Sequence, residues 1–320
     1  MAFVMKQRLE IGLITLHKIL EADLIEGRKE HASELRIKLP KALGYNSQLI
    51  KKGQDVRWYA WYEGSFLKKS EILEFEGIVI DVSAKQPLEI VCRDGMFAMQ
   101  LKKLTKNFYN TSIESYLQQI SPSGTAIKVD PAIAGVKITM DTNGRSGAWA
   151  AKQLHKRGID VFFRGGILYA QDPTKVLSPG LPKRFKLTHN IIKDEVSTRE
   201  GKDVTIVVRS YQTETGRTLE GRYGKGDPHF VDVDRLSQKE ATELAKSIYK
   251  EIAGKGLVGK FEAFGAPSVK HSEIIHFEDP DDSKRTKNVF VEKVTKTWSA
   301  KDAKYRQNIH LSVVDFKGAE

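Results

Sequence analysis

Cysteine is almost absent from this 320-residue chain, and long apolar runs are missing as well. The single cysteine, Cys92, excludes an internal disulfide and cannot form a metal cluster alone, and its apolar neighbours predict a buried structural thiol. No segment approaches the roughly 20 consecutive apolar residues that a membrane helix requires, so we expect no spanning segment. Charged residues at Lys6, Arg8 and Glu10 interrupt the N-terminal stretch. We therefore expect no signal peptide, and folding in the cytoplasm.

Long runs of lysine and arginine, low-complexity tracts and internal repeats are also missing. The chain holds 52 Lys and Arg against 41 Asp and Glu, a net charge of +11, and residues 101–200 alone hold 16 against 8. This surplus would suit an anionic partner such as nucleic acid, but without a basic run we favour an ordinary solvated surface. Hydrophobic residues make up 40%, enough for sizeable cores, and the length predicts two or three domains.

Alternation of apolar and charged residues predicts β-strands through the first hundred residues. Residues 34–39 show the pattern, with Leu35, Ile37 and Leu39 on one face, and Pro40 ends the strand because it cannot donate to a ladder. Further strands are expected at 8–12, 53–62, 75–82 and 88–92. Short antiparallel strands at this spacing indicate a barrel or a sandwich.

The middle of the chain changes to mixed helix and strand. Thr111 to Glu114 matches a capping box, and the apolar stripe that follows predicts a helix as far as Ile120. A second helix is expected over 146–157, ended by Gly158. Strands are expected at 126–129 and 136–140, and a hairpin at 159–169. Together these elements predict a compact α+β unit.

The last third returns to strands around one helix. Ser237 to Glu240 is a capping box, and the helix it begins should run to residue 253. A polar, glycine-rich stretch at 216–229 is expected to be a flexible loop. Strands are expected at 185–192, 203–212, 257–264, 270–277, 288–294 and 305–313.

Catalytic and metal-binding motifs are not recognisable. The nearest approach to a metal site is the group His271, Glu273, His276 and Glu278. On a strand the first two would face away from the last two, so the four cannot converge on one ion. Gly216 to Gly221 has the glycine spacing of a phosphate-binding loop but lacks the lysine that follows it. We therefore expect no catalytic residue, no cofactor and no metal, and a protein that is not an enzyme.

Four aromatic residues gather in one predicted strand: Trp58, Tyr59, Trp61 and Tyr62. Alternation puts Trp58 and Tyr62 on one face of the strand and the other two on the opposite face. Such residues can stack on the bases of single-stranded nucleic acid, but the split between two faces favours core packing or a subunit contact. We take all four as candidate subunit-interface residues.

Three parts of the chain carry a resemblance to a known family. In the first, Gly53–Trp58 is followed by Phe75–Val79 and Ile90–Asp94, which resembles the first barrel of phage baseplate hub proteins. The second is the α+β unit, which is similar to the domain that those proteins insert into that barrel. The third comprises the helix at 237–253 and the strands after it, such as Lys304–Leu311. It resembles the late-control protein D family and the N-terminal hub part of type VI secretion VgrG proteins.

The resemblance implies a β-rich α+β fold with two β-barrel-like tube or hub domains and a small inserted α+β domain. Residues 1–100 with about 184–215 would form the first barrel, 101–183 the insertion, and 216–320 a second barrel-like domain with one helix. The chain ends at Glu320 without a repetitive β-helix, so we expect the spike to be a separate polypeptide.

In functional terms, the resemblance implies a non-catalytic homotrimer in a virion tail tip. This trimer would join a hexameric tail tube to a trimeric spike, and DNA would pass through its lumen without specific binding. Two alternatives stay open. A nucleic-acid-binding β-barrel protein is supported by the sequence pI of about 9.4 and by the aromatic strand. A tail-associated cell-wall hydrolase would need a carboxylate or metal site that the sequence does not show.

Overall fold

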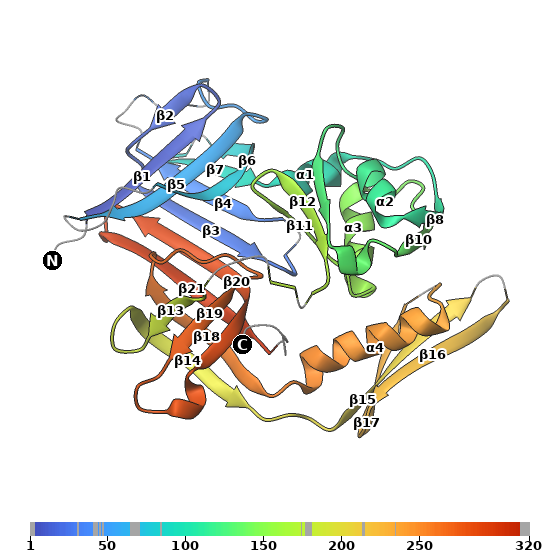
Figure 1. Ribbon diagram of the computed structural model, residues 1–320. Helices are drawn as coiled ribbons and strands as arrows, with labels where there is room; N and C mark the ends of the chain where they lie inside the picture. The colour runs from blue at the N-terminus through green and yellow to red at the C-terminus, as the bar shows by residue number, and fades with distance from the viewer. Residues whose placement is uncertain are drawn as a thin grey trace.

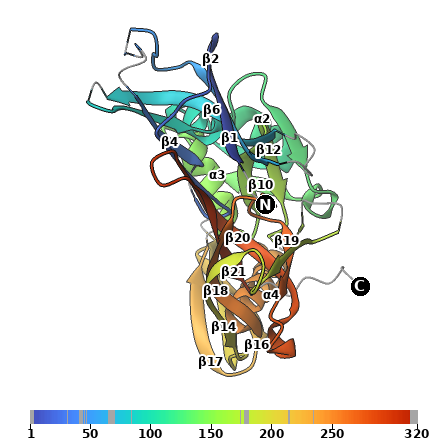
Figure 2. The same cartoon turned by 90° about the vertical axis from the view of Figure 1, so that its left-hand side faces the viewer.

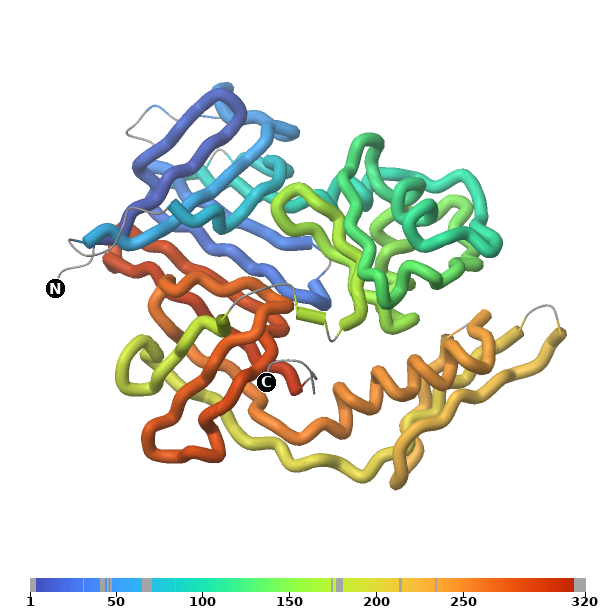
Figure 3. The backbone as a smooth tube through the Cα atoms, in the orientation of Figure 1, coloured from blue at the N-terminus to red at the C-terminus, as the bar shows by residue number. Residues whose placement is uncertain are grey.

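The computed structural model shows a β-rich α+β protein with three lobes (Figure 1). It describes residues 4–30, 32–40, 44, 46, 48–64, 71–83, 85–173, 175–176, 181–212, 215–233 and 235–313. A large sheet forms the body, residues 95–173 form a mixed unit beside it, and residues 204–253 form a projecting arm (Figures 1 and 3). Within the described residues no helix is long and apolar enough to cross a bilayer.

Thirteen strands from both ends of the chain make the body one continuous sheet. The N-terminal strands are β1 (Val4–Ile11), β2 (Ile14–Leu16), β3 (Glu21–Gly27), β4 (Glu34–Leu39), β5 (Asp55–Glu63), β6 (Ile72–Ser83) and β7 (Leu88–Arg93). The later strands are β13 (Lys183–Lys186), β14 (Ile191–Arg199), β18 (Gly256–Phe264), β19 (Ile274–Glu278), β20 (Lys287–Ser299) and β21 (Lys304–Ser312). Their order is β14-β18-β21-β20-β3-β4-β7-β6-β5-β1-β2, with β19 beside β20 and β13 beside β19. The five strands that alternation predicted before residue 100 are confirmed.

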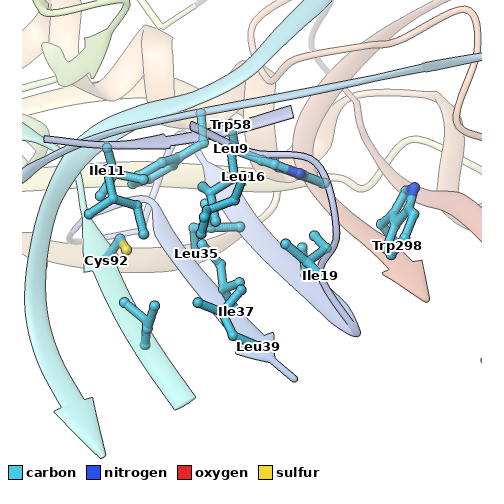
Figure 4. Packing of buried hydrophobic residues seen from close by; sticks show 14 of the residues in the cluster. Leu9, Ile11, Leu16, Ile19, Leu35, Ile37, Leu39, Trp58, Cys92 and Trp298 are labelled. Carbon is cyan, nitrogen blue, oxygen red and sulfur yellow. The ribbon is translucent and has the colours of Figure 1, made fainter. Parts of the chain in front are cut away.

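The sheet curls around two cores, one in each half. The first core contains Leu35 and Trp58 (Figure 4), and the second contains Phe185 and Phe261. Strand β20 pairs with β19 and β21 of its own half and with β3 of the other half. No pairing between described residues closes either half, so both are open sheets rather than the barrels we expected. In the first half the outer edge of β3 pairs with β20 of the other half, and in the second half the outer edge of β14 has no partner strand among the described residues.

Residues 184–215 do not complete the first half, which corrects our expectation. Strand β13 pairs with β19 and β14 pairs with β18, so both belong to the second half. Packing explains the difference, because the ring centroid of Phe185 lies 5.3 Å from that of Phe261 inside the second core. Strand β15 (Val204–Gln212) joins neither half and forms part of the arm.

The two halves repeat one another, although no repeat is visible in the sequence. The order β3-β4-β7-β6-β5 in the first half corresponds to β14-β18-β21-β20-β19 in the second. Each half has an irregularity at the same point of its long strand, between Val79 and Asp81 in β6 and between Val291 and Lys293 in β20. The same two backbone hydrogen bonds mark each irregularity: Gly53 N to Val79 O (2.8 Å), Val79 N to Gln54 O (2.9 Å), Ser272 N to Val291 O (2.8 Å) and Val291 N to Glu273 O (2.9 Å).

Backbone conformation repeats as well. Left-handed φ angles occur at the equivalent residues Gly53 (87°) and Ser272 (59°). Following the strand registers from one half to the other makes Ser83 of β6 equivalent to Thr295 of β20. The same procedure makes Ile25 of β3 equivalent to Ser197 of β14. The chain therefore contains one five-stranded unit twice.

The mixed unit confirms the expected helices and hairpin. Its elements are α1 (Gly95–Leu101), β8 (Phe108–Ser112), α2 (Ile113–Ile120), β9 (Ala126–Val129), β10 (Lys137–Met140), α3 (Gly147–Lys156), β11 (Asp160–Arg164) and β12 (Ile167–Gln171). Short 3-10 helices lie at η2 (Pro131–Ile133) in this unit and at η3 (Ser283–Arg285) in the body. Ser112 rather than Thr111 caps α2, since its side chain accepts from the N–H of Ser115. Ser146 caps α3 as expected.

The arm corrects our expectation of a loop at residues 216–229. Strand β15 pairs with β16 (Arg217–Gly224) and β17 (Asp227–Asp232), and α4 (Gln238–Ala253) packs on this small sheet. Ser237 and Glu240 form the expected capping box of α4. A Cβ at Gly221 would lie 2.2 Å from the backbone of Ala241, so this glycine allows close packing rather than flexibility. The arm lies at the opposite end of the molecule from β2 (Figure 2).

Candidate functional site

The four candidate interface residues lie on β5, which is not an edge strand. It pairs with β1 on one side and with β6 on the other, so a partner chain cannot extend the sheet there. Trp58 is fully buried in the first core, and Trp61 is only 6% exposed. Tyr62 is half-buried, and its hydroxyl donates to the carbonyl oxygen of Tyr305 at 2.5 Å. Three of the four side chains therefore pack largely within the chain.

Tyr59, like Tyr62, is half-buried, and the guanidinium carbon of Arg8 lies 4.0 Å from its ring centroid. An arginine over an aromatic face is a frequent feature of protein interfaces. An interface role for these residues remains a prediction, and it would have to act through the face of the sheet.

A buried arginine joins all the lobes of the molecule. Arg28 follows β3 and is 1% exposed. Its Nη1 donates to Oδ2 of Asp160 in the mixed unit at 3.0 Å, and its Nη2 donates to Oε1 of Glu251 in the arm at 2.6 Å. Its backbone N–H donates to the carbonyl oxygen of Glu292 in β20 at 3.0 Å. Arg28 thus connects both halves of the body, the mixed unit and the arm.

Ionic attraction holds this contact against the cost of burial. Burial opposes the charge on Arg28, but Asp160 and Glu251 outweigh that effect and raise its pKa. In the same way burial would raise the pKa of Glu251, but Arg28 and Lys29 lower it. Nδ1 of His155 lies 3.1 Å from the second carboxylate oxygen of Asp160. Because loss of one partner would leave a buried charge unpaired, this network fixes how the lobes are placed.

A second buried network connects β6 with the β20–β21 pair. Glu74 on β6 accepts from Nζ of Lys296 on β20 and from the hydroxyl of Tyr305 on β21, the latter at 2.7 Å. Burial would raise the pKa of Glu74, but the charge of Lys296 outweighs it and the net shift is downward. Burial and the adjacent Glu74 raise the pKa of Tyr305, so the phenol stays a donor. This network locks the two halves together inside the body.

A cavity of about 220 Å³ lies where the two halves meet the mixed unit. The charged and titratable side chains among its lining residues are Glu26, Asp55, Glu74, Glu76, Asp94, Arg164, Lys270 and His271. Arg164 donates to the carbonyl oxygen of His271, and Lys270 donates to the carbonyl oxygen of Glu74 at 3.1 Å. Arg164 therefore joins the mixed unit to the body, Lys270 joins the two halves of the body, and the arrangement is that of a packed junction.

The histidine and glutamate cluster does not come together as a metal site. His271 and Glu273 precede β19 and are buried, and Glu273 pairs with Lys183 at 2.7 Å. On β19, Nδ1 of His276 lies 2.9 Å from Oδ1 of Asn288. Among the described residues no three His, Cys, Asp or Glu side chains gather as metal ligands. Cys92 is buried as expected, and burial raises the pKa of its thiol, which disfavours the nucleophilic thiolate.

Sequence reasoning missed the strand edges that the body leaves unpaired. Strand β14 ends the sheet on one side, so its outer edge has no partner strand among the described residues. The pairing of β6 with β5 stops at Ile78, so from Asp81 to Ser83 no described strand lies against that edge of β6. Alternation identifies a strand but not its neighbours, so no local signal could have identified these edges.

No family model and no curated protein matches this sequence. Solved structures do match. A tail protein from Neisseria meningitidis MC58 aligns with a TM-score of 0.70 at 12% identity, covering 97% of this chain and 96% of that one. The 43 kDa tail protein of prophage MuSo2 from Shewanella oneidensis aligns with a TM-score of 0.64 at 12% identity, covering 97% and 98%.

A third match is a component of the type VI secretion system of Escherichia coli that exhibits structural similarity to T4 bacteriophage tail proteins. It aligns with a TM-score of 0.63 at 12% identity, covering 97% of this chain and 79% of that one. At this identity the likeness is one of fold. The chain has the fold of these two tail proteins and of this secretion component, and the resemblance seen in the sequence to hub-like tail proteins is confirmed at that level.

Proposed function

We propose that this protein is a non-catalytic structural subunit of a phage-type tail tip, a homotrimeric hub that joins a tail tube to a spike. The observation that carries the proposal is the internal repeat of the body. Each chain presents two equivalent five-stranded units, so three chains would present six. A ring of six units matches a hexameric tube, whereas the mixed unit and the arm occur once per chain and suit a threefold partner.

The solved structures of the same fold support this assignment. Two are tail proteins, and the third is a secretion component that exhibits structural similarity to phage tail proteins. In this role the partners are the tube and spike proteins and further copies of the chain. DNA would pass through the lumen without specific binding. A lumen that made many contacts to the phosphates would retain the DNA and oppose its passage. The protein would be located in the tail tip of the virion.

The absolute mass in solution tests the proposal. Light scattering on a size-exclusion column at moderate salt should give about three times the chain mass of 36.1 kDa. A monomer at every accessible concentration would contradict the homotrimer. A salt series with a short DNA duplex is the companion measurement. Binding that weakens steeply as salt rises would support the nucleic-acid-binding alternative instead.

A further inference from the structure

We propose that the side chains of Lys296 and Glu74 become joined by an amide bond, which the protein forms once, within its own body and without a cofactor. Nζ of Lys296 on β20 donates to Oε2 of Glu74 on β6, and both side chains are fully buried. Two groups that are held in contact react as though each were present at roughly 10⁵–10⁸ M. The bond lies inside one chain, so this proposal does not depend on the proposed ring.

Burial makes the amide the more stable form of this pair. In water, hydration of the free ammonium and carboxylate groups favours hydrolysis of an amide. The pair of Lys296 and Glu74 has lost that hydration, so condensation to a neutral amide removes two buried charges and the cost of burying them. The water molecule that is released has room to leave, because Glu74 lines the cavity of about 220 Å³ between the two halves and the mixed unit.

Tyr305 holds the carboxyl group of Glu74 in position for attack. The hydroxyl of this fully buried tyrosine donates to Oε1 of Glu74 at 2.7 Å. When Nζ of Lys296 attacks the carboxyl carbon, Oε1 gains negative charge, and a donor that is already in place stabilises this charge. The hydroxyl of Ser268 accepts from Nζ at 2.7 Å and orients the nitrogen beside Oε2. Oε2 is therefore the oxygen that leaves as water.

Glu26 on β3 is the group that can move the protons. It is 5% exposed, and its Oε1 has no hydrogen-bond partner among the described residues. The ladder between β3 and β20 puts Leu24 opposite Lys296, and Glu26 lies two residues further along, on the same face. Diagonal neighbours on one face of a strand pair lie about 7–8 Å apart, within reach of long side chains. Glu26 also lines the same cavity as Glu74, so its free oxygen can pass a proton between the two reacting groups.

The atoms and charges of the reaction balance. The carboxylate of Glu26 takes one proton from the ammonium group of Lys296 and passes it to Oε2 of Glu74. The neutral amine then attacks the carboxyl carbon, and the new N–C bond forms. Glu26 takes a second proton from the nitrogen and passes it to Oε2, the C–Oε2 bond breaks, and Oε2 leaves as water. Glu26 is again a carboxylate, and neither an oxidant nor a reductant is required.

The intact mass of the denatured protein tests the cross-link. The natural protein, once folded, should be lighter than its sequence mass by one water molecule, whereas Lys296→Met should have its full sequence mass. In a tryptic digest, cleavage after Lys296 should be absent, and the peptide that contains Lys296 should be joined to the peptide that contains Glu74. A natural protein of full sequence mass, or a loss of water that maps to a single peptide, would overturn the proposal. The natural protein decides this alone, even if Lys296→Met fails to fold.

Three further variants test the roles of the neighbouring groups. Tyr305→Phe and Glu26→Gln keep both partners of the bond, and after cell-free synthesis each should lose water about 100-fold more slowly than the natural protein. The matched control is Lys270→Met, because Lys270 is also buried and donates only to the backbone carbonyl oxygen of Glu74. This variant should lose water as the natural protein does. Loss of water that stops in Lys270→Met and continues in Lys296→Met would overturn the assignment of Lys296.

Discussion

Asp94 holds two segments of the chain with one carboxylate. Its Oδ1 accepts from the N–H of Met96 at the start of α1 at 3.0 Å, and its Oδ2 accepts from the N–H of Ser33 before β4 at 2.9 Å. The side chain lies at the junction of the first half with the mixed unit. Burial raises the pKa of Asp94 to about 6, because the two N–H groups offset only part of the cost of burying its charge.

Asp94→Asn should therefore change how stability depends on pH. The pKa of Asp94 in the folded state lies above its ordinary value of 3.8, so the folded state binds more protons between these values. The contribution of Asp94 to the free energy of unfolding is full below its ordinary pKa of 3.8. It is lost as the pH rises through the folded-state pKa of about 6. The free energy of unfolding of the natural protein minus that of the variant should fall by up to about 3 kcal/mol between about pH 4 and about pH 7.5. Urea unfolding at both pH values measures this difference.

The matched control is Asp203→Asn, which removes one carboxylate at an exposed position. Its stability difference from the natural protein should be the same at both pH values. If Asp94→Asn behaved in the same way, the raised pKa of Asp94 would be wrong.

At the scale of elements, the arm depends on one close approach between a strand and a helix. Gly221→Ala places a Cβ 2.2 Å from the backbone of Ala241, so α4 must move away from β16. We expect the arm to lose roughly 1–3 kcal/mol of stability, the usual cost of overpacking. Hydrogen exchange should become faster in residues 204–253 and stay unchanged in the body.

Gly135→Ala is the control for this substitution. Nothing lies within 4 Å of a Cβ at this position, and its φ is not in the left-handed region. Equal exchange in the two variants would show that α4 does not press on β16 as the structure describes.

Local patterns predicted which elements form, because capping residues and apolar stripes act within a few residues. Ser146 and Ser237 cap their helices as expected, and α2 ends at Ile120 as its apolar stripe predicted. The glycine-rich segment before α4 misled us, since its glycines allow close packing in strands. Nothing local distinguishes a glycine under a helix from a glycine in a loop.

Strand pairing could not be predicted, because it depends on distant segments. The repeat shows why: β6 reads Ile78-Val-Ile-Asp-Val-Ser83, and β20 reads Phe290-Val-Glu-Lys-Val-Thr295. Only two valines are identical at equivalent positions, and the residues between them, which are half-buried or exposed, differ. The same limit applies to the candidate site. Burial of Trp58 follows from its strand, but the open edges of β6 and β14 follow only from the order of the sheet.

At the scale of the whole molecule, Arg28 determines how the lobes are placed. Arg28→Met keeps the length of the side chain but removes the buried cation beside Asp160 and leaves Glu251 with the exposed Lys29 only. Breaking a buried pair by removing one partner costs about 3–5 kcal/mol. We expect faster hydrogen exchange in both β11 and α4, together with a larger radius of gyration in solution scattering.

Lys29→Met is the neighbouring control. Lys29 also pairs with Glu251 and Glu292, at 3.5 Å and 3.0 Å, but its side chain is 60% exposed. Solvent screening limits such a pair to about 1 kcal/mol or less, so the lobes should keep their arrangement. A radius of gyration that is identical in both variants would mean that contacts other than Arg28 hold the arm and the mixed unit.

Strand β20 also has a mechanical consequence. Its ladder with β3 has seven registered pairs, from Lys293–Gly27 to Ser299–Glu21, and joins the two halves without a linker. A pull along the strands loads these hydrogen bonds together in shear, whereas a pull across them would open the ladder one bond at a time. Along the strand direction the seam is therefore stiff. Force applied to one half in that direction is transmitted to the other half, and the two halves respond as one rigid body.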